Sequence, residues 1–397
     1  MVKFPSRLTF RRLTPAFAAL ALLALTGCAT LPERKEIRYT GDPIADGNAE
    51  RAAAPVQERA LWDFRIAASA LRVNNPEEAK LHLDDALPLI GGILANDADA
   101  KKARSLFGSE SNKTFIGEPY ERVMAYYYRG LLYWRDGQPD NARACYRSGQ
   151  LIDSDSEAAE YKSDYVLLDY LDGLVSTKLS ADGSDAFACA QANAKNRKLP
   201  AYDPAANVLI FAEYGTGPRK YGGGEYGEQL KFFTKDSSAH SATLAINGQT
   251  VRLPAYDDLN FQATTRGGRV MDHILGGKAV FKRNTDVVGD VALTGAAIAA
   301  NQRGRNADTT ALALGAIGLF SKLASAATTP KADIRMWDNL PQRLSFAALR
   351  LAPGDYPATL EFKDASGRTL AALTQTLNLH VDPTDRDTVI FLSELKR

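Results

Sequence analysis

The period of the hydrophobic pattern changes near Leu199-Pro200, and this change constrains the fold more than any other feature of the chain. From Glu58 to about Arg197, apolar residues recur at the three- and four-residue spacing of an amphipathic helix. Further along, apolar residues alternate at every second position, which is typical of strands. We therefore predict an α+β chain with a helical domain over residues 55–200 and a β-rich domain over residues 201–397.

Small residues and turn signals in the first half predict helical hairpins that stack on one another. The clearest stretch, Val123 to Asp153, places Gly130 and Ala142 on either side of the turn Asp136-Gly137-Gln138-Pro139. Weaker copies surround Asn74-Asn75-Pro76 and Asp182-Gly183. These stretches resemble tetratricopeptide repeats, which implies a solenoid whose stacked hairpins share a continuous core. An unrelated helical bundle is the alternative.

Aromatic residues gather in the clearest of these stretches. Tyr126 and Tyr133 are one helix face apart, and we expect them in the core. Tyr127 and Trp134 share a different face with the same spacing. We consider these two as candidate contacts to a partner peptide in a concave groove, with burial in the repeat core as the alternative.

The second half predicts an antiparallel, sandwich-like sheet with a helical insert. Strand patterns occur at Val208–Ala212 and Ser241–Asn247, and Asn247-Gly248 is a hairpin turn signal. Further strands are expected at Leu344–Leu351, Tyr356–Phe362, Leu370–Val381 and Val389–Leu392. The insert, residues 287–328, is rich in Ala and Gly and predicts a close-packed helical hairpin. Contact with a partner or another copy, and insertion into a bilayer, are the alternatives for this hairpin.

The N-terminus has the pattern of an export signal. Four basic residues and no acid precede an apolar run from Ala16 to Leu25, which is short for a membrane span. The ending Leu25-Thr26-Gly27-Cys28 resembles the lipobox of bacterial lipoproteins. That resemblance implies removal of residues 1–27 as a signal peptide and diacylation of Cys28. An uncleaved signal anchor, or a plain signal peptide with a chance cysteine, is the alternative.

The resemblance also indicates where the chain resides. Ala29 follows the cysteine where Asp is the usual mark for retention in the inner membrane, so we expect the outer membrane, facing the periplasm. Residues 28–54 are then a flexible tether. Cleavage removes four positive charges from a net charge of +1, which leaves −3. Because nucleic-acid binding needs a basic surface, we expect no nucleic-acid partner.

The sequence contains none of the common catalytic or metal-binding motifs considered below. The four histidines include no pair within one helical turn, and no G-x-S-x-G elbow occurs. The Gly-rich stretches 215–224 and 276–278 lack the P-loop order, so we expect loops there. Cys145 and Cys189 are expected as two buried thiols rather than a disulfide. We therefore predict no enzyme, no metal and no cofactor besides the covalent lipid on Cys28.

Three sequence motifs, in their order along the chain, suggest a family. They are FIGEPYER at 115–122, EYGTGPRK at 213–220 and ADIRMWDNLP at 332–341. Together they resemble a little-characterised family of proteobacterial envelope lipoproteins with a tetratricopeptide half and a β half. The resemblance implies an outer-membrane lipoprotein that works with other envelope lipoproteins, and it implies no established reaction.

Two of these motifs contain further candidate contacts. Arg219 and Lys220 follow a strand pattern through a turn, and we consider them as positive charges for an anionic polymer or a partner carboxylate. Arg335 and Trp337 are either an exposed partner site or a stacked, hydrogen-bonded corner that leads into the final strands.

From these features we expect a protein-binding scaffold or adaptor in cell-envelope assembly or maintenance. It would be anchored through Cys28 and would hold a periplasmic or envelope protein through its helical half. One alternative is an envelope hydrolase that acts on glycan or peptide with carboxylates between the domains. Another is a structural subunit of a secretion or surface assembly. The sequence leaves the oligomeric state open.

Overall fold

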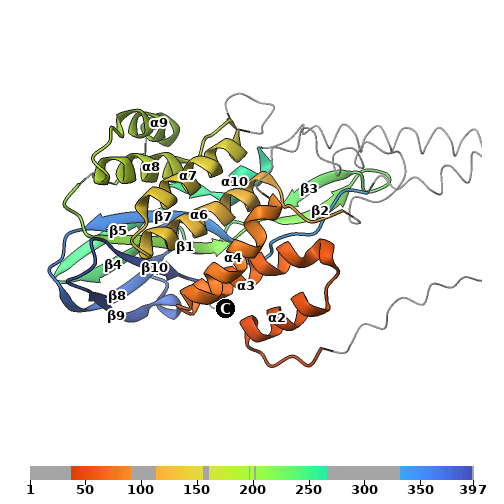
Figure 1. The fold of residues 1–397 in the computed structure, drawn as a ribbon, viewed down its shortest axis with the longest axis horizontal. Coiled ribbons are helices and arrows are strands. Elements are labelled where there is room, and N and C mark those ends of the chain that lie inside the picture. The colour runs from red at the N-terminus through yellow and green to blue at the C-terminus, as the bar shows by residue number, and fades with distance from the viewer. Residues whose placement is uncertain are drawn as a thin grey trace, which may run out of the picture. The chain divides into compact units, whose positions relative to one another are not determined.

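A computed structural model describes residues 37–90, 113–154, 161–195, 197–200, 203–265 and 331–395. The fold is mixed α+β, with eight α-helices and ten β-strands in these ranges (Figure 1). The helices are α2 (Pro43–Ala53), α3 (Arg59–Arg72), α4 (Pro76–Ile90), α6 (Pro119–Arg135), α7 (Pro139–Asp153), α8 (Val166–Lys178), α9 (Ser184–Ala194) and α10 (Leu259–Thr264).

Consecutive helices pair as antiparallel hairpins, α3 with α4, α6 with α7 and α8 with α9, and α7 also packs on α8. In the hairpin of α6 and α7, the two helices approach closely at Gly130, because a Cβ there would lie 2.6 Å from Cε1 of Tyr146 on α7. The turn ends α6 with Gly137 at a φ of +72°, a conformation that favours glycine. Pro139 then begins α7 at a position where proline is tolerated.

The strands form two four-stranded sheets and a separate two-stranded ribbon. The first sheet has the order β10-β1-β7-β6 and the second β5-β4-β8-β9, while β2 and β3 make the ribbon. Their bounds are β1 (Val208–Thr216), β2 (Arg219–Gly223), β3 (Gln229–Phe233), β4 (Ser241–Ile246), β5 (Gln249–Pro254), β6 (Asp257–Asp258), β7 (Pro341–Leu349), β8 (Gly354–Lys363), β9 (Gln375–Val381) and β10 (Thr388–Ser393).

The strand pairings are antiparallel except for β10, which runs parallel to β1 with Ile390 beside Ile210. The sheets are therefore antiparallel-rich, as expected, and the pairing of β10 with β1 departs from that pattern. The chain reaches β10 from β9 in the second sheet, and it enters the first sheet beside the start of β1, with Thr388 opposite Val208. The predicted hairpin turn is confirmed, since Asn247 and Gly248 both have positive φ between β4 and β5.

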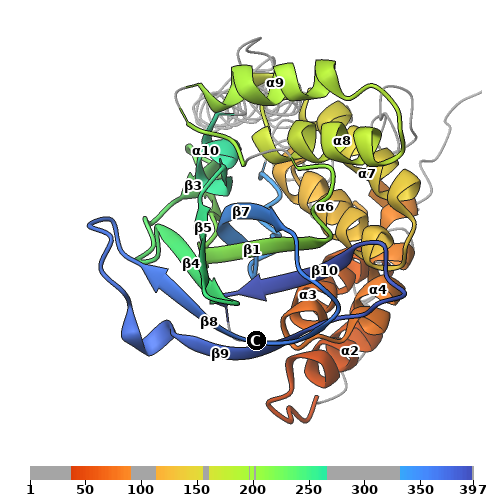
Figure 2. The ribbon, with the colours of Figure 1, turned by 90° about the vertical axis from the view of Figure 1, so that its left-hand side faces the viewer.

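The two faces of β1 build two different cores. Val208, Ile210 and Ala212 pack against the second sheet. Leu209 and Phe211 instead join a larger cluster with the helices. Helices, first sheet and second sheet thus form three layers (Figure 2). The predicted division into separate domains at residue 200 is wrong, because residues from Tyr39 onward form one unit in which helices and sheet share a core.

The predicted tether is wrong over residues 43–53, which form α2. Asp42 caps this helix, accepting a 2.8 Å hydrogen bond from the Ile44 N–H, and Pro43 occupies the first turn. The helix packs on α3, where a Cβ at Gly47 would lie 2.6 Å from Ile66.

Several predictions fall outside the described residues. They are the signal peptide at 1–27, the lipidation of Cys28 and the helical hairpin at 287–328. Among the helices that are described, none is both long and apolar enough to cross a membrane.

Candidate functional site

Tyr127 and Trp134, the candidate peptide contacts, lie inside the molecule with 1% of each residue exposed. Both rings meet Phe211 of β1 edge-on, at 6.1 and 6.4 Å between centroids. Their assignment to a surface groove is wrong, because the first helix of each hairpin (α3, α6 and α8) contacts the first sheet. The chain's own sheet therefore covers the side on which a peptide was expected.

Trp337, in contrast, confirms the interpretation as a structural corner and not as an exposed site. Its ring is fully buried and stacks on Phe64 of α3, 4.6 Å between centroids. The indole Nε1 donates to Asn339 Oδ1 at 2.7 Å, and the Trp337 N–H donates to Glu121 Oε1 at 2.7 Å. Arg335 belongs to the same corner, where its guanidinium pairs with Asp333 at 2.6 Å and donates to the Lys113 carbonyl.

Lys220 and Arg219 are neighbours in β2 with opposite environments. Lys220 is buried, and its Nζ lies 2.5 Å from Glu121 Oε2 on α6 and 2.9 Å from the Arg335 carbonyl. The prediction that Lys220 presents charge to a partner is therefore wrong. Arg219 points from the other face of the strand and is exposed. The expectation of a loop across 215–224 is also wrong, since β1 and β2 include most of it.

Glu121 is the residue on which these contacts converge. Besides Lys220 and Trp337, its Oε2 accepts the Glu118 N–H at 2.6 Å in a capping box that begins α6. Burial raises the pKa of the Glu121 carboxyl, while the Lys220 charge and the Trp337 N–H oppose this rise. This carboxylate thus joins the helical layer, the ribbon and the corner.

Two further ion pairs cross the boundary between helices and sheet. Arg72 of α3 pairs with Glu213 of β1 at 2.7 Å, with both side chains at most 2% exposed. Lys178 of α8 pairs with Asp387 at 2.5 Å, just before β10. We call these two and Lys220–Glu121 the interface ion pairs. Removing either residue of such a pair would leave the charge of the other residue buried without its counter-ion.

Asp257 of β6 lies at the same boundary, where the charge of Arg197 also acts on it. Its carboxylate accepts the backbone N–H groups of Val166 and Leu167, at 2.8 and 2.9 Å, where α8 begins. Burial raises the pKa of Asp257 to about 7, although those hydrogen bonds lower it. Such a carboxylate satisfies the helix N-terminus and complements its dipole, so we interpret Asp257 as a structural cap.

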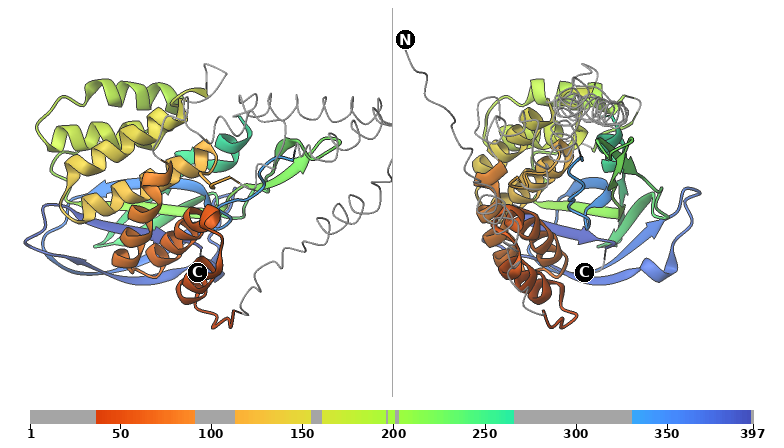
Figure 3. Two further views of the ribbon diagram at one scale, coloured as in Figure 1. Left: turned by 45° about the vertical axis from the view of Figure 1, so that its right-hand side comes forward. Right: turned by 90° about the vertical axis from the view of Figure 1, so that its right-hand side faces the viewer.

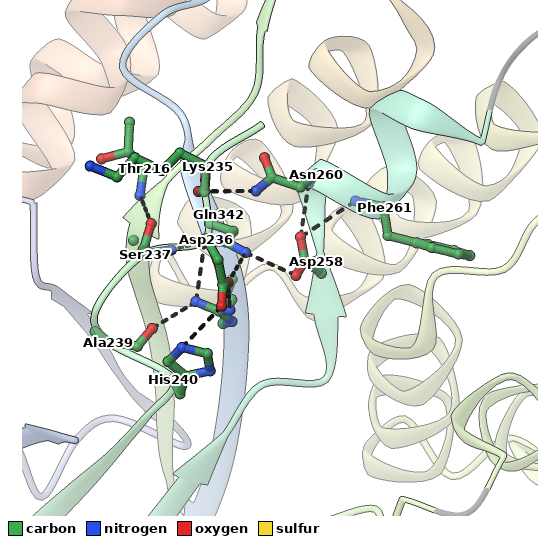
Figure 4. Close-up of polar contacts among 12 residues, drawn as sticks. Thr216, Lys235, Asp236, Ser237, Ala239, His240, Asp258, Asn260, Phe261 and Gln342 are labelled. Atoms are coloured by element: carbon green, nitrogen blue, oxygen red, sulfur yellow. Dashed lines mark hydrogen bonds and ion pairs between the residues drawn. The ribbon is translucent and has the colours of Figure 1, made fainter. Parts of the chain in front are cut away.

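A partly exposed polar cluster lies where the chain leaves β3 (Figure 4). Asp236 pairs with Arg343 of β7 and lies 3.2 Å from His240 Nε2. Gln342 donates from its Nε2 to both Asp236 and Asp258, at 3.1 Å each. Hydrogen bonds from Gln342 and Arg343 hold the pKa of Asp236 below its ordinary value. The cluster ties the end of the ribbon to β7 and α10.

The ribbon β2–β3 extends away from the sheets, as Figure 3 shows. Its outward face carries two cross-strand pairs, Arg219 opposite Phe233 and Tyr221 opposite Lys231. Phe233 is 62% exposed and Tyr221 46%. Of the predicted contact residues in the described ranges, Arg219 is the one with clear exposure, and it lies on this face.

Tyr221 and Phe233 are the surface residues that the sequence reading missed. Reading residues 215–224 as a loop hid the alternation of exposed and inward positions in Arg219–Tyr221 and Lys231–Phe233. Period-two alternation on both sides of a Gly-rich turn is a hairpin signal that would have identified them.

Neither thiol pairs in a disulfide, as expected, but Cys189 is exposed whereas Cys145 is buried. No group of three or more potential metal ligands occurs within the described ranges. Comparisons of the chain with protein-family models, curated proteins and solved structures found no match.

Proposed function

We propose that this chain is a lipoprotein, anchored at Cys28 in the outer membrane and facing the periplasm, that serves as a binding scaffold or adaptor for another envelope protein. The lipobox pattern supports the anchor. The observation that supports the adaptor role is the outward side of the helical layer. There Leu81 and Leu89 of α4 are 56% and 48% exposed, and Leu151 of α7 is 59% exposed.

Leu81 and Leu151 lie opposite the buried faces of their helices, whereas Leu89 lies at the edge of the buried face of α4, two turns from His82. On α4, Ala79, Leu83 and Ala86 face inward and are fully buried, whereas about half of Leu81 and of Leu89 is exposed. Exposed apolar side chains on the outward sides of helices are typical of a surface that receives a partner helix. The contact surface proposed here is therefore the outward side of the hairpins, since the inward side is covered by the sheet.

The hydrolase alternative gains nothing from the boundary between helices and sheet. Glu121, Glu213, Asp257 and Asp387 lie there, and each is bound to a cation or to backbone N–H groups. A glycosidase would need two carboxyls converging across a cleft. The assembly-subunit alternative depends on residues 287–328, and it stays a prediction.

Photocrosslinking in intact cells tests the adaptor proposal. A photoreactive amino acid at position 81 or 89 of the full chain should yield discrete protein adducts, identified by mass spectrometry. The control position is Asn378, which is exposed on the second sheet at the far side of the three layers. Leu81→Glu should abolish the adduct formed from position 89. Equal adducts from position 378, or no discrete adduct from the α4 positions, would refute the proposal.

A further inference from the structure

The outward face of the β2–β3 ribbon has an ordered composition. Because opposite residues of an antiparallel pair share a face, Arg219 lies beside Phe233 and Tyr221 beside Lys231. Aromatic and cationic side chains thus alternate in both directions across the face. Neither strand contains an acidic residue. The face is therefore both apolar and positively charged.

The inward face of the ribbon fixes the position of the outward one. Lys220 is held by Glu121, and Phe232 packs edge-on against Tyr120 of α6 with 5.8 Å between centroids. On the outward face the stem of Lys231 lies over Gly223, where a Cβ would come within 2.8 Å of the lysine Cδ. The ribbon consequently presents its aromatic and cationic side chains on a supported backbone.

We propose that this face binds the headgroup region of an anionic phospholipid membrane. Cations near such a surface are attracted to its negative potential, and aromatic rings are favoured at the depth of the headgroups. Phe233 has no polar atom with which to recognise a partner by hydrogen bonding, but its ring can enter the boundary between headgroups and acyl chains. Arg219 and Lys231 would then lie at the level of the lipid phosphates.

The proposed anchor at Cys28 agrees with a membrane as the binding partner of this face. Residues 28–39 can span at most about 40 Å when extended, so a lipid on Cys28 would keep the folded unit close to the bilayer. This inference rests on the proposed anchor for the presence of a membrane, but the binding itself requires no lipidation.

Vesicle co-sedimentation with unlipidated protein separates the two proposals. The chain of residues 29–397 retains the whole unit from Tyr39 onward. It should bind phosphatidylglycerol-containing vesicles and bind pure phosphatidylcholine vesicles much more weakly. High salt should reduce the binding, because electrostatic attraction at a surface is screened.

Charge-removing variants measure how much the two cations of the ribbon contribute to vesicle binding. Arg219→Gln/Lys231→Gln should lower the partition coefficient on anionic vesicles about 30-fold, which follows from about 1 kcal/mol per cation near an anionic surface. The matched control, Arg350→Gln/Lys198→Gln, removes two exposed cations outside the ribbon and should leave binding unchanged. Phe233→Ser should weaken binding as well, whereas Leu179→Ser, at an exposed leucine outside the ribbon, should not.

Three results would overturn the inference. One is no binding of the wild-type chain to phosphatidylglycerol vesicles. Another is equal loss in the control and ribbon variants, which would mean that charge anywhere on the surface suffices. The third is capture of poly-glutamate by the ribbon without capture of vesicles, which would assign the face to an acidic protein segment. None of them bears on Cys28, whose acylation is measured separately.

Discussion

Removing the Lys220 charge tests how the helices are held to the ribbon. In Lys220→Met, Glu121 stays buried without its cation, since the two side chains are 2% and 0% exposed in the wild type. Breaking a buried pair from one side typically costs about 3–5 kcal/mol of unfolding free energy. The N–H groups of Trp337 and Glu118 still bind the carboxylate, so we expect the lower part of that range.

The pH dependence has a definite sign. Burial already raises the pKa of Glu121 above its ordinary 4.5, and Lys220 is the largest influence that opposes the rise. In Lys220→Met the pKa rises further, so the folded state retains a proton that the unfolded state releases. The variant therefore loses stability relative to wild type as pH rises from the folded-state pKa of Glu121 in wild type to its higher folded-state pKa in the variant. The loss is up to about 1.4 kcal/mol per pH unit in this interval.

Urea unfolding of the chain of residues 29–397, at several values between about pH 5 and pH 8, measures both effects. The double variant Glu121→Gln/Lys220→Met completes the cycle, and it should cost less than the sum of the single variants because no buried charge remains. Additive single effects, or a Lys220→Met penalty that is independent of pH, would refute the assignment of this pair as a buried, coupled contact.

Three further predictions concern the anchor, the hairpins and the thiols. Cys28→Ala should abolish palmitate labelling and stable membrane fractionation, and a labelled, membrane-retained variant would contradict the lipobox interpretation. Gly130→Ala should lower the free energy of unfolding by about 1–3 kcal/mol, because the new Cβ would overlap the buried Tyr146 ring; unchanged stability would mean that α6 and α7 do not meet there. A thiol reagent should modify Cys189 promptly and Cys145 only on unfolding, because burial shields Cys145 and raises its pKa to about 12; equal rates in the folded protein would contradict this.

Local features of the chain could be predicted from the sequence. The turn at Asp136–Pro139, the close approach at Gly130 and the hairpin at Asn247-Gly248 each depend on residues that are near one another along the chain. Propensity and spacing are sufficient for such features, because proline and glycine restrict the backbone directly.

The relation between the two halves could not be predicted in this way. Periodicity shows that the face with Tyr127 and Trp134 is apolar, but the pattern is the same whether the covering layer is another repeat, a partner or the chain's own sheet. Strand β1 contained a clue, since its continuous apolar run places side chains of both faces in cores. A strand of this kind is packed against other elements on both faces. The helical half of the chain packs against one of these faces.

Burial of Lys220 was similarly hidden. A lysine next to an arginine suggests exposed charge, and its partner Glu121 is 99 residues away in the sequence. Because alternation in a strand sends neighbours to opposite faces, the pair Arg219-Lys220 divides into one surface residue and one core residue once β2 is recognised as a strand.

The parallel pairing of β10 with β1 has a consequence for the order of folding. Glu213 and Ser393, bonded at 2.7 Å, are 180 positions apart in the chain. A polypeptide that emerges from its N-terminal side therefore offers β1 only one neighbour, β7, until residues 388–393 arrive. Contacts this distant in sequence slow folding, because the loop between them must close before they contribute. We expect completion of the first sheet, and with it the docking of Asp387 onto Lys178, to be a late and rate-limiting event.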